Sequence, residues 1–127
     1  MLLFGNENKA STQILDDALT TLDPSIFLRA SLRGIEPGAS AVVDSLRFAS
    51  DLELASRLGF RTLRVLAPDT TRRDRLERRG QIFDFAVDGV HRSEVELDTV
   101  EADVTVVNTL SMEDLYEQVR AAIFSLA

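Results

Sequence analysis

The sequence predicts an α/β fold in which a parallel sheet is flanked by helices. Three short apolar runs, near residues 41–44, 62–67 and 104–108, have the composition of buried strands. The segments between them place apolar residues three and four positions apart, which is the spacing of amphipathic helices. Strands that alternate with helices favour a parallel sheet, so we expect the three strands to be adjacent or nearly so.

Length and composition limit the class of protein. The chain of 127 residues predicts one domain, 1–127, and its 45% hydrophobic residues suffice for a core. It has no cysteine, so disulfides and thiolate metal sites are excluded, and we expect no metal-ligand cluster. It also has no apolar run of about 18 residues and no basic leader, which predicts a cytoplasmic protein without membrane contact. A net charge of -7 disfavours nucleic-acid binding.

Two helices are predicted before the first strand. Residues 1–12 fit either a short strand with a loop or the start of a helix. Apolar residues three and four apart predict a helix over 12–22. Asp23 followed by Pro24 predicts the start of a second helix, with Asp23 as its N-cap and the proline in its first turn. Gly34 ends that helix.

The central stretch, 41–80, holds two predicted strands that are each followed by a helix. Ala41–Val43 is apolar at every position, as expected of a strand buried on both faces. The pattern then predicts a helix over 49–58 that stops at Gly59. A second strand follows over 62–67, and it leads into an arginine-rich segment.

The strongest chemical signal is a cluster of five arginines after the second predicted strand. They lie within eight residues, in a helix that Thr70 or Thr71 should cap and Gly80 should close. Arginine favours bidentate contact with phosphate, so the cluster predicts a site for a small phosphorylated ligand or a nucleotide. The alternative is a solvated helix in which Asp74 and Glu77 pair with the arginines. The five are Arg72, Arg73, Arg75, Arg78 and Arg79.

The C-terminal third predicts a loop, a strand and a capped helix. Residues 81–99 lack clear periodicity and read as a loop with short helical or extended pieces. The strand near 104–107 ends in Asn108. Ser111 is the predicted N-cap of the last helix, with Asp114 in the place that glutamate usually takes in a capping box. The predicted buried stripe of this helix is Leu115, Val119, Ala122, Ile123 and Leu126.

Polar residues follow each of the three predicted strands. Ligands of parallel α/β sheets bind at the carboxyl ends of the strands. Asp44 to Arg47 follow the first strand, Pro68 and the arginine helix follow the second, and Asn108 follows the third. We therefore expect these groups to converge at one sheet edge, with an anion held between Arg47 and the stripe of arginines.

The order of these features resembles the C-terminal part of P-loop kinases, most nearly the deoxynucleoside monophosphate kinases and phosphomevalonate kinases. In that family Asp-x-x-Arg or Asp-x-Arg ends a core strand, as Asp44-Ser45-Leu46-Arg47 does here. The family's lid arginines resemble the cluster at 72–79, and its Ser-Glu element, often preceded by His, resembles 91–94. Its strand that ends in Asn resembles 104–108, and the likeness spans roughly residues 12 to 125.

The resemblance implies a three-layer α/β/α fold with an arginine-rich lid at about 69–99. It implies ATP-dependent phosphoryl transfer to a small phosphorylated acceptor, with ATP and Mg²⁺ as cofactors. Catalytic roles are implied for Asp44, Arg75 and Arg79, and Asn108 would lie near the nucleotide base. Binding of the acceptor or of phosphate is implied for Arg47, Arg72, Arg73, Arg78, His91 and Glu94.

These site residues also have structural interpretations. Asp44 is a candidate cap for a helix that starts near Ser50, and Arg47 is a candidate for a surface ion pair. His91 is a candidate loop residue, and Asn108 is a candidate for closing a turn.

The phosphate loop of the family, GxxxxGK[ST], does not occur in this sequence. Its nearest match, Gly5 to Thr12, lacks the second glycine, and Lys9, the one lysine of the chain, stands at the wrong offset. Either the loop lies upstream of this chain, or the protein is a non-catalytic relative that binds a nucleotide or a protein partner. The sheet centre must then be filled by Leu2–Phe4, by direct pairing of neighbours or by a partner chain, so we expect a homo-oligomer or a missing N-terminal segment.

Overall fold

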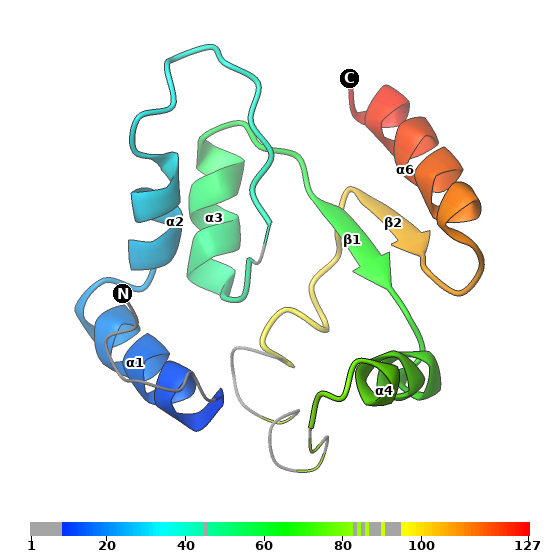
Figure 1. Ribbon diagram of the computed structural model, residues 1–127. Helices are drawn as coiled ribbons and strands as arrows, with labels where there is room; N and C mark the ends of the chain where they lie inside the picture. Colours follow the sequence, from blue (N-terminus) through cyan, green and yellow to red (C-terminus); the bar gives the residue numbers. More distant parts are fainter. Residues whose placement is uncertain (1–8, 45, 83, 85, 87–89, 91–94) are drawn as a thin grey trace. The chain divides into compact units, whose positions relative to one another are not determined.

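The protein is α/β in a computed structural model that describes residues 9–44, 46–82, 84, 86, 90 and 95–127 (Figure 1). The chain divides into two compact units, Met1–Leu58 with Phe85–Asp98 and Gly59–Asp84 with Thr99–Ala127. The elements are α1 (Lys9–Leu22), α2 (Ile26–Leu32), α3 (Ala49–Arg57), β1 (Leu63–Leu66), α4 (Asp69–Arg78), β2 (Val104–Val107) and α6 (Met112–Leu126). No helix of the described residues combines the length and the apolar character needed to cross a membrane.

The first unit contains α1, α2 and α3. The helix predicted over 12–22 is confirmed, although α1 already begins at Lys9. Among the described residues of this unit, the buried apolar ones are Leu28 of α2, Phe48 just before α3, and Ala55 of α3. Large apolar residues of α1 remain outside this small core, since Leu22 is 81% exposed.

Asp23 is not the N-cap of α2, which corrects the prediction. The helix begins at Ile26 and follows Ser25, whose side chain makes no capping hydrogen bond. Asp23 Oδ1 instead accepts a hydrogen bond from the Ser25 backbone N–H at 3.0 Å. This bond forms a turn of the kind that aspartate makes with the backbone two residues on. Pro24 therefore lies in the turn before the helix, and the helix starts later than predicted.

The strand predicted at Ala41–Val43 is wrong. These residues have no regular secondary structure, and Val42 is 97% exposed. A strand needs a neighbour that accepts and donates its backbone hydrogen bonds. The described part of the chain has a sheet of only two strands, β1 and β2. An apolar run of three residues was thus too short to define a strand without such a neighbour.

The loop after this run leads into α3, whose predicted end is confirmed. Gly59 has a φ of 84°, the left-handed conformation that favours glycine just after a helix. At the other end of α3, Asp44 does not cap the helix. The structural interpretation of Asp44 as a helix cap is therefore wrong. Phe48 occupies the N-cap position, and the Ala49 N–H donates to Glu96 Oε1 at 2.8 Å.

The sheet of the second unit pairs β1 with β2 in parallel. The register runs from Leu63 opposite Val104 to Leu66 opposite Val107, which confirms that these two predicted strands are adjacent and parallel. Val106 is the buried residue of this sheet, with 3% of its surface exposed.

The helix that follows β1 starts before either threonine predicted to cap it. α4 begins at Asp69, and Pro68 precedes it without any side-chain cap. Thr70 and Thr71 therefore lie inside the first turn, and the negative charge of Asp69 is the favourable group at this helix start. Gly80 has a φ of 67° and closes the helix as predicted.

The capping box predicted for the last helix is confirmed in α6. The Ser111 hydroxyl accepts from the Asp114 N–H, and Asp114 Oδ2 accepts from the Ser111 N–H, both at 3.2 Å. α6 packs against β2, and Ala122 is buried against it while Leu115, Val119 and Leu126 are half-buried.

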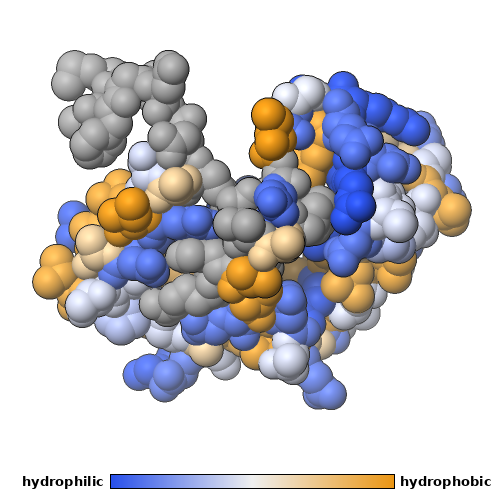
Figure 2. Space-filling model, turned by 90° about the horizontal axis from the view of Figure 1, so that it is seen from below, coloured by the Kyte–Doolittle hydropathy of each residue, from blue (hydrophilic) through white to orange (hydrophobic). Residues whose placement is uncertain are grey.

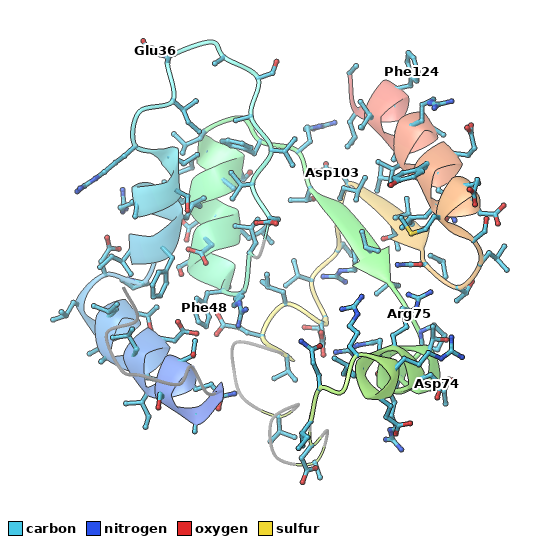
Figure 3. The ribbon with its side chains drawn as sticks, viewed as in Figure 1. Glu36, Phe48, Asp74, Arg75, Asp103 and Phe124 are labelled. Carbon is cyan, nitrogen blue, oxygen red and sulfur yellow. The ribbon has the colours of Figure 1, made fainter. Side chains whose placement is uncertain are left out.

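Ile123 is the member of the predicted stripe that is wrong, because it is 60% exposed. It follows Ala122 by one position, about 100° around the helix, and so turns away from the short β2. Phe124 is also exposed at the outer side of α6 (Figure 3). In the view of Figure 2, hydrophobic residues (orange) and hydrophilic residues (blue) are interspersed on the surface.

Candidate functional site

The ends of β1 and β2 bring the arginine helix and Asn108 to one edge of the sheet. The Asn108 N–H donates to the Leu66 carbonyl at 2.7 Å, so the two strands are still joined where they end. α4 begins at Asp69, just beyond that point. This is the carboxyl edge of a parallel sheet, where ligands of α/β proteins bind.

The arginines of α4 differ in whether they have partners. Arg72 Nη1 lies 3.2 Å from Asp69 Oδ1, and Arg73 also takes part in an interaction. In the part of the chain that the structure describes, the side chains of Arg75, Arg78 and Arg79 form no ion pair or hydrogen bond. Three guanidinium groups with their donors unused are therefore close together in sequence, at the C-terminal end of the helix that follows this edge.

The acids within α4 do not neutralise these arginines. No ion pair of the described residues includes Asp74 or Glu77. Figure 3 shows Asp74 and Arg75 on different sides of α4, as expected for consecutive residues about 100° apart around a helix. The helix has no buried residue, and Leu76 is half-buried. α4 thus contributes positive charge rather than core.

The other predicted site residues lie elsewhere. Asp44 is exposed and Arg47 is half-buried, and both belong to the first unit. Arg47 has an interaction of its own. His91 and Glu94 fall outside the described residues. An anion shared between Arg47 and the α4 arginines therefore stays a prediction.

The first unit contains a cavity of about 200 Å³. This volume is below the ~300–1,000 Å³ of pockets that hold a drug-sized ligand, so it suits one ring or a comparable fragment. α1, α2 and the start of α3 supply its walls, which combine aromatic, acidic and basic side chains. The lining residues are Thr12, Asp16, Phe27, Arg47, Phe48 and Asp51.

Asp51 is the most unusual of these residues, because it is a carboxylate with only 5% of its surface exposed. It lies three residues after the N-cap Phe48, a position from which a side chain reaches back to the backbone N–H of the cap. It accepts hydrogen bonds from the backbone of Phe48 and Arg47 and from the Ser25 side chain.

Those bonds leave one oxygen of the Asp51 carboxylate unsatisfied. Oδ1 is buried and has no hydrogen-bond partner in the described structure. Burial is the main effect on this group and raises the pKa of Asp51, while the bonds from Phe48, Ser25 and Arg47 partly offset the increase. The negative charge of Glu96 raises the pKa slightly further.

Sequence reasoning missed most of this cavity. Asp51 reads as an ordinary acid in the first turn of a helix, and Phe27 and Phe48 read as core residues. Of the lining residues, the sequence predicts a functional role only for Arg47. The signal in the sequence is an aromatic residue, Phe48, just before a predicted helix that has an acid, Asp51, at its third position. That pattern is common. Among the described residues, no group of three or more His, Asp or Glu side chains is placed to hold a metal ion.

The chain is similar to a UPF0200 protein of Aeropyrum pernix, with 37% identity over 97 residues. The similarity covers 69% of this chain and 52% of that protein, so the chain spans about half the length of this curated relative. The name of the relative describes no activity. No family model matches the chain, and no solved structure matches it.

Proposed function

We propose that this chain is the acceptor-binding and lid-bearing part of a protein of the nucleotide-kinase type, which transfers phosphoryl groups from ATP to a small phosphorylated acceptor. One observation carries the proposal: Arg75, Arg78 and Arg79 have no partner in the described structure and follow the carboxyl edge of a parallel sheet. Guanidinium groups with unused donors are suited to bidentate contacts with phosphate oxygens.

The residues of this chain fit the phosphates of ATP better than they fit a metal ion. Arg75 and Arg79 would stabilise the negative charge on the phosphates, which is the main task of the protein in phosphoryl transfer. By the resemblance to P-loop kinases, Asp44 would help to hold Mg²⁺, because magnesium is usually bound through one or two carboxylates and its substrate. Asn108 would lie beside the nucleotide base.

The second candidate function is a non-catalytic module that binds a nucleotide or a protein partner. The observation that favours it is the sequence itself, which has no GxxxxGK[ST] and a single lysine, Lys9. Under the first function, the backbone amides and lysine that hold the nucleotide phosphates come from outside these 127 residues.

Anion binding by α4 tests the shared basis of both candidates. We expect calorimetric titration at low salt to show binding of ATP and of inorganic phosphate to the wild-type chain. Arg75→Ala/Arg79→Ala should weaken that binding at least tenfold, since each charge-assisted hydrogen bond contributes about 1.5–3 kcal/mol.

The matched control is Arg57→Ala/Arg120→Ala, which removes the same charge from two exposed arginines that are already paired with Glu53 and Glu117. This control should bind as the wild type does. Equal losses in the two double variants would mean that net charge, and not the α4 site, accounts for binding. No binding to the wild type would contradict the proposal.

A further inference from the structure

We propose that the second unit pairs with a second copy of itself through the free edge of β1, so that two antiparallel β1 strands join the sheets of two chains into one. This inference concerns backbone groups and apolar side chains and does not depend on phosphoryl transfer. Its basis is a strand edge without a neighbour, an apolar surface beside that edge, and a β1 sequence that is complementary to itself.

The free edge of β1 follows from the way in which β1 pairs with β2. The carbonyls of Thr62 and Leu66 accept hydrogen bonds on the β2 side, at 3.1 and 2.7 Å. Because the backbone groups of successive strand residues point to alternate edges, Leu63 and Val65 direct theirs away from β2. No strand of the described residues pairs with that side. Gln118 occupies part of the β2 edge, so between these two strands the edge of β1 is the one open to another chain.

The apolar surface beside this edge belongs to the face of the sheet that α6 covers. Val65 lies opposite Val106 in the register, so both side chains project from the same face. Val106 is 3% exposed and α6 packs against its strand, whereas Val65 is 51% exposed. Figure 1 shows α6 on the β2 side of the strand pair. α6 therefore leaves β1 uncovered on this face.

α6 adds a stripe of exposed apolar side chains that faces the same space. Gln118 reaches the outer edge of β2, and Ala122 is buried. At about 100° per residue, Ala122 lies between Gln118 and the stripe around the helix, which places the stripe on the side of β1. Contiguous apolar surface of this kind marks interaction sites. The stripe consists of Met112, Tyr116 and Ile123, which are 53%, 60% and 60% exposed.

The β1 sequence is complementary to itself in the antiparallel register that places Val65 opposite Val65. The outward N–H and carbonyl of one Val65 then pair with those of the other. Leu63 lies opposite Ala67, a large residue against a small one, and Arg64 lies opposite Leu66. Centring the pair one residue earlier would place the two Arg64 side chains opposite each other, and like charges so placed are destabilising.

The two-fold symmetry of this pair encloses the apolar surface. It places both α6 helices on the same face of the joined sheet, with their stripes turned toward each other above the two β1 strands. Removal of Val65 and the stripe from water favours association. The charges just outside β1 agree with the register, because Arg61 of one chain approaches Asp69, the first residue of α4, in the other.

Sedimentation velocity of the full chain and hydrogen exchange of the Val65 amide test the pairing. We expect a dimer in which this amide exchanges slowly, and faster exchange on dilution to the monomer. Val65→Pro removes an N–H that β2 does not use, so it should give a monomer. Val65→Thr, which keeps the N–H and the shape, should still dimerise. A monomeric wild type would overturn the proposal, whether the amide exchanges fast because the edge is empty or slowly because another segment covers it.

Substitutions on α6 locate the apolar part of the interface. Ile123→Ser should weaken dimerisation at least tenfold, because it removes a large apolar side chain from each copy. Phe124→Ser is the matched control: it is 78% exposed but lies about 100° from Ile123 around the helix, and it should leave dimerisation unchanged. If Val65→Pro does not fold, these two variants and the exchange of Val65 in the wild type still decide the question. Equal losses in the two α6 variants, or a dimer of folded Val65→Pro, would contradict the proposal.

Discussion

Asp103 joins the start of β2 to the residue before β1. Its Oδ2 accepts from the Thr62 N–H at 2.7 Å and from the Thr62 hydroxyl at 2.8 Å, and its own N–H donates to that hydroxyl at 2.9 Å. The bonds from Thr62 are the main reason why the pKa of Asp103 is lowered, and the charge of Arg61 contributes less. Asp103 thereby fixes the point at which the parallel pair begins.

This lowered pKa makes the stability of the sheet depend on pH. An acid whose pKa is lower in the folded state stabilises the fold above its unfolded pKa, and that contribution is lost as pH falls through the folded pKa. We expect Asp103→Asn to lower the melting temperature at pH 7. The difference from the wild type should shrink as pH falls below about 4, where the unfolded aspartate also becomes protonated.

Thermal denaturation followed by circular dichroism between pH 7 and pH 3 measures this effect. Glu101→Gln, a nearby exposed acid, is the matched control and should change the melting temperature little at any pH. A deficit in Asp103→Asn that stays constant over the whole range would show that the carboxylate charge is not what stabilises this junction.

At the scale of elements, Gln118 of α6 takes the place of a neighbouring strand at the outer edge of β2. Its Oε1 accepts from the Val107 N–H at 2.9 Å, and its Nε2 donates to the Val107 carbonyl at 3.0 Å. These are the backbone groups that a further strand would bind. Because unpaired strand edges invite association with other chains, α6 protects this edge as well as covering β2.

We expect Gln118→Ala to lower the free energy of unfolding by about 1–2 kcal/mol, the net value of two hydrogen bonds. It should also increase self-association, since the β2 edge becomes available. Urea denaturation and sedimentation velocity measure the two effects. Gln81→Ala, which truncates an exposed glutamine of the same unit, is the control. If both variants behave alike, the two hydrogen bonds between Gln118 and Val107 have no role in stability or in protecting the β2 edge.

The elements also show what the sequence could and could not predict. The Ser111–Asp114 capping box is local, and the prediction from four residues was confirmed. The runs that became β1 and β2 were equally clear. The strand prediction for Ala41–Val43 is wrong because a strand depends on a partner elsewhere in the chain. The burial of Asp51 could not be predicted either, since it depends on Ser25 and Phe27, which lie far from it in sequence.

At the scale of the whole molecule, negative net charge and a local cluster of positive charge coexist. The chain carries a net charge of -7, yet two arginines of α4 and the one that follows it have no partner in the described residues. A local positive site on an acidic protein favours small anions over a long polyanion, whose backbone the overall field repels. Self-association or a missing N-terminal segment stays a prediction.

A coupled assay of ATP-dependent phosphoryl transfer, run on the purified 127-residue chain with Mg²⁺ and deoxynucleoside monophosphates, decides whether these residues suffice for catalysis. We expect the chain to bind nucleotide but to give no measurable turnover. Without the amide cradle and lysine of a phosphate loop, the charge on the transferred group lacks its main stabilisation. Robust turnover by this chain, lost in Arg75→Ala/Arg79→Ala, would contradict the claim that the loop must come from outside these residues.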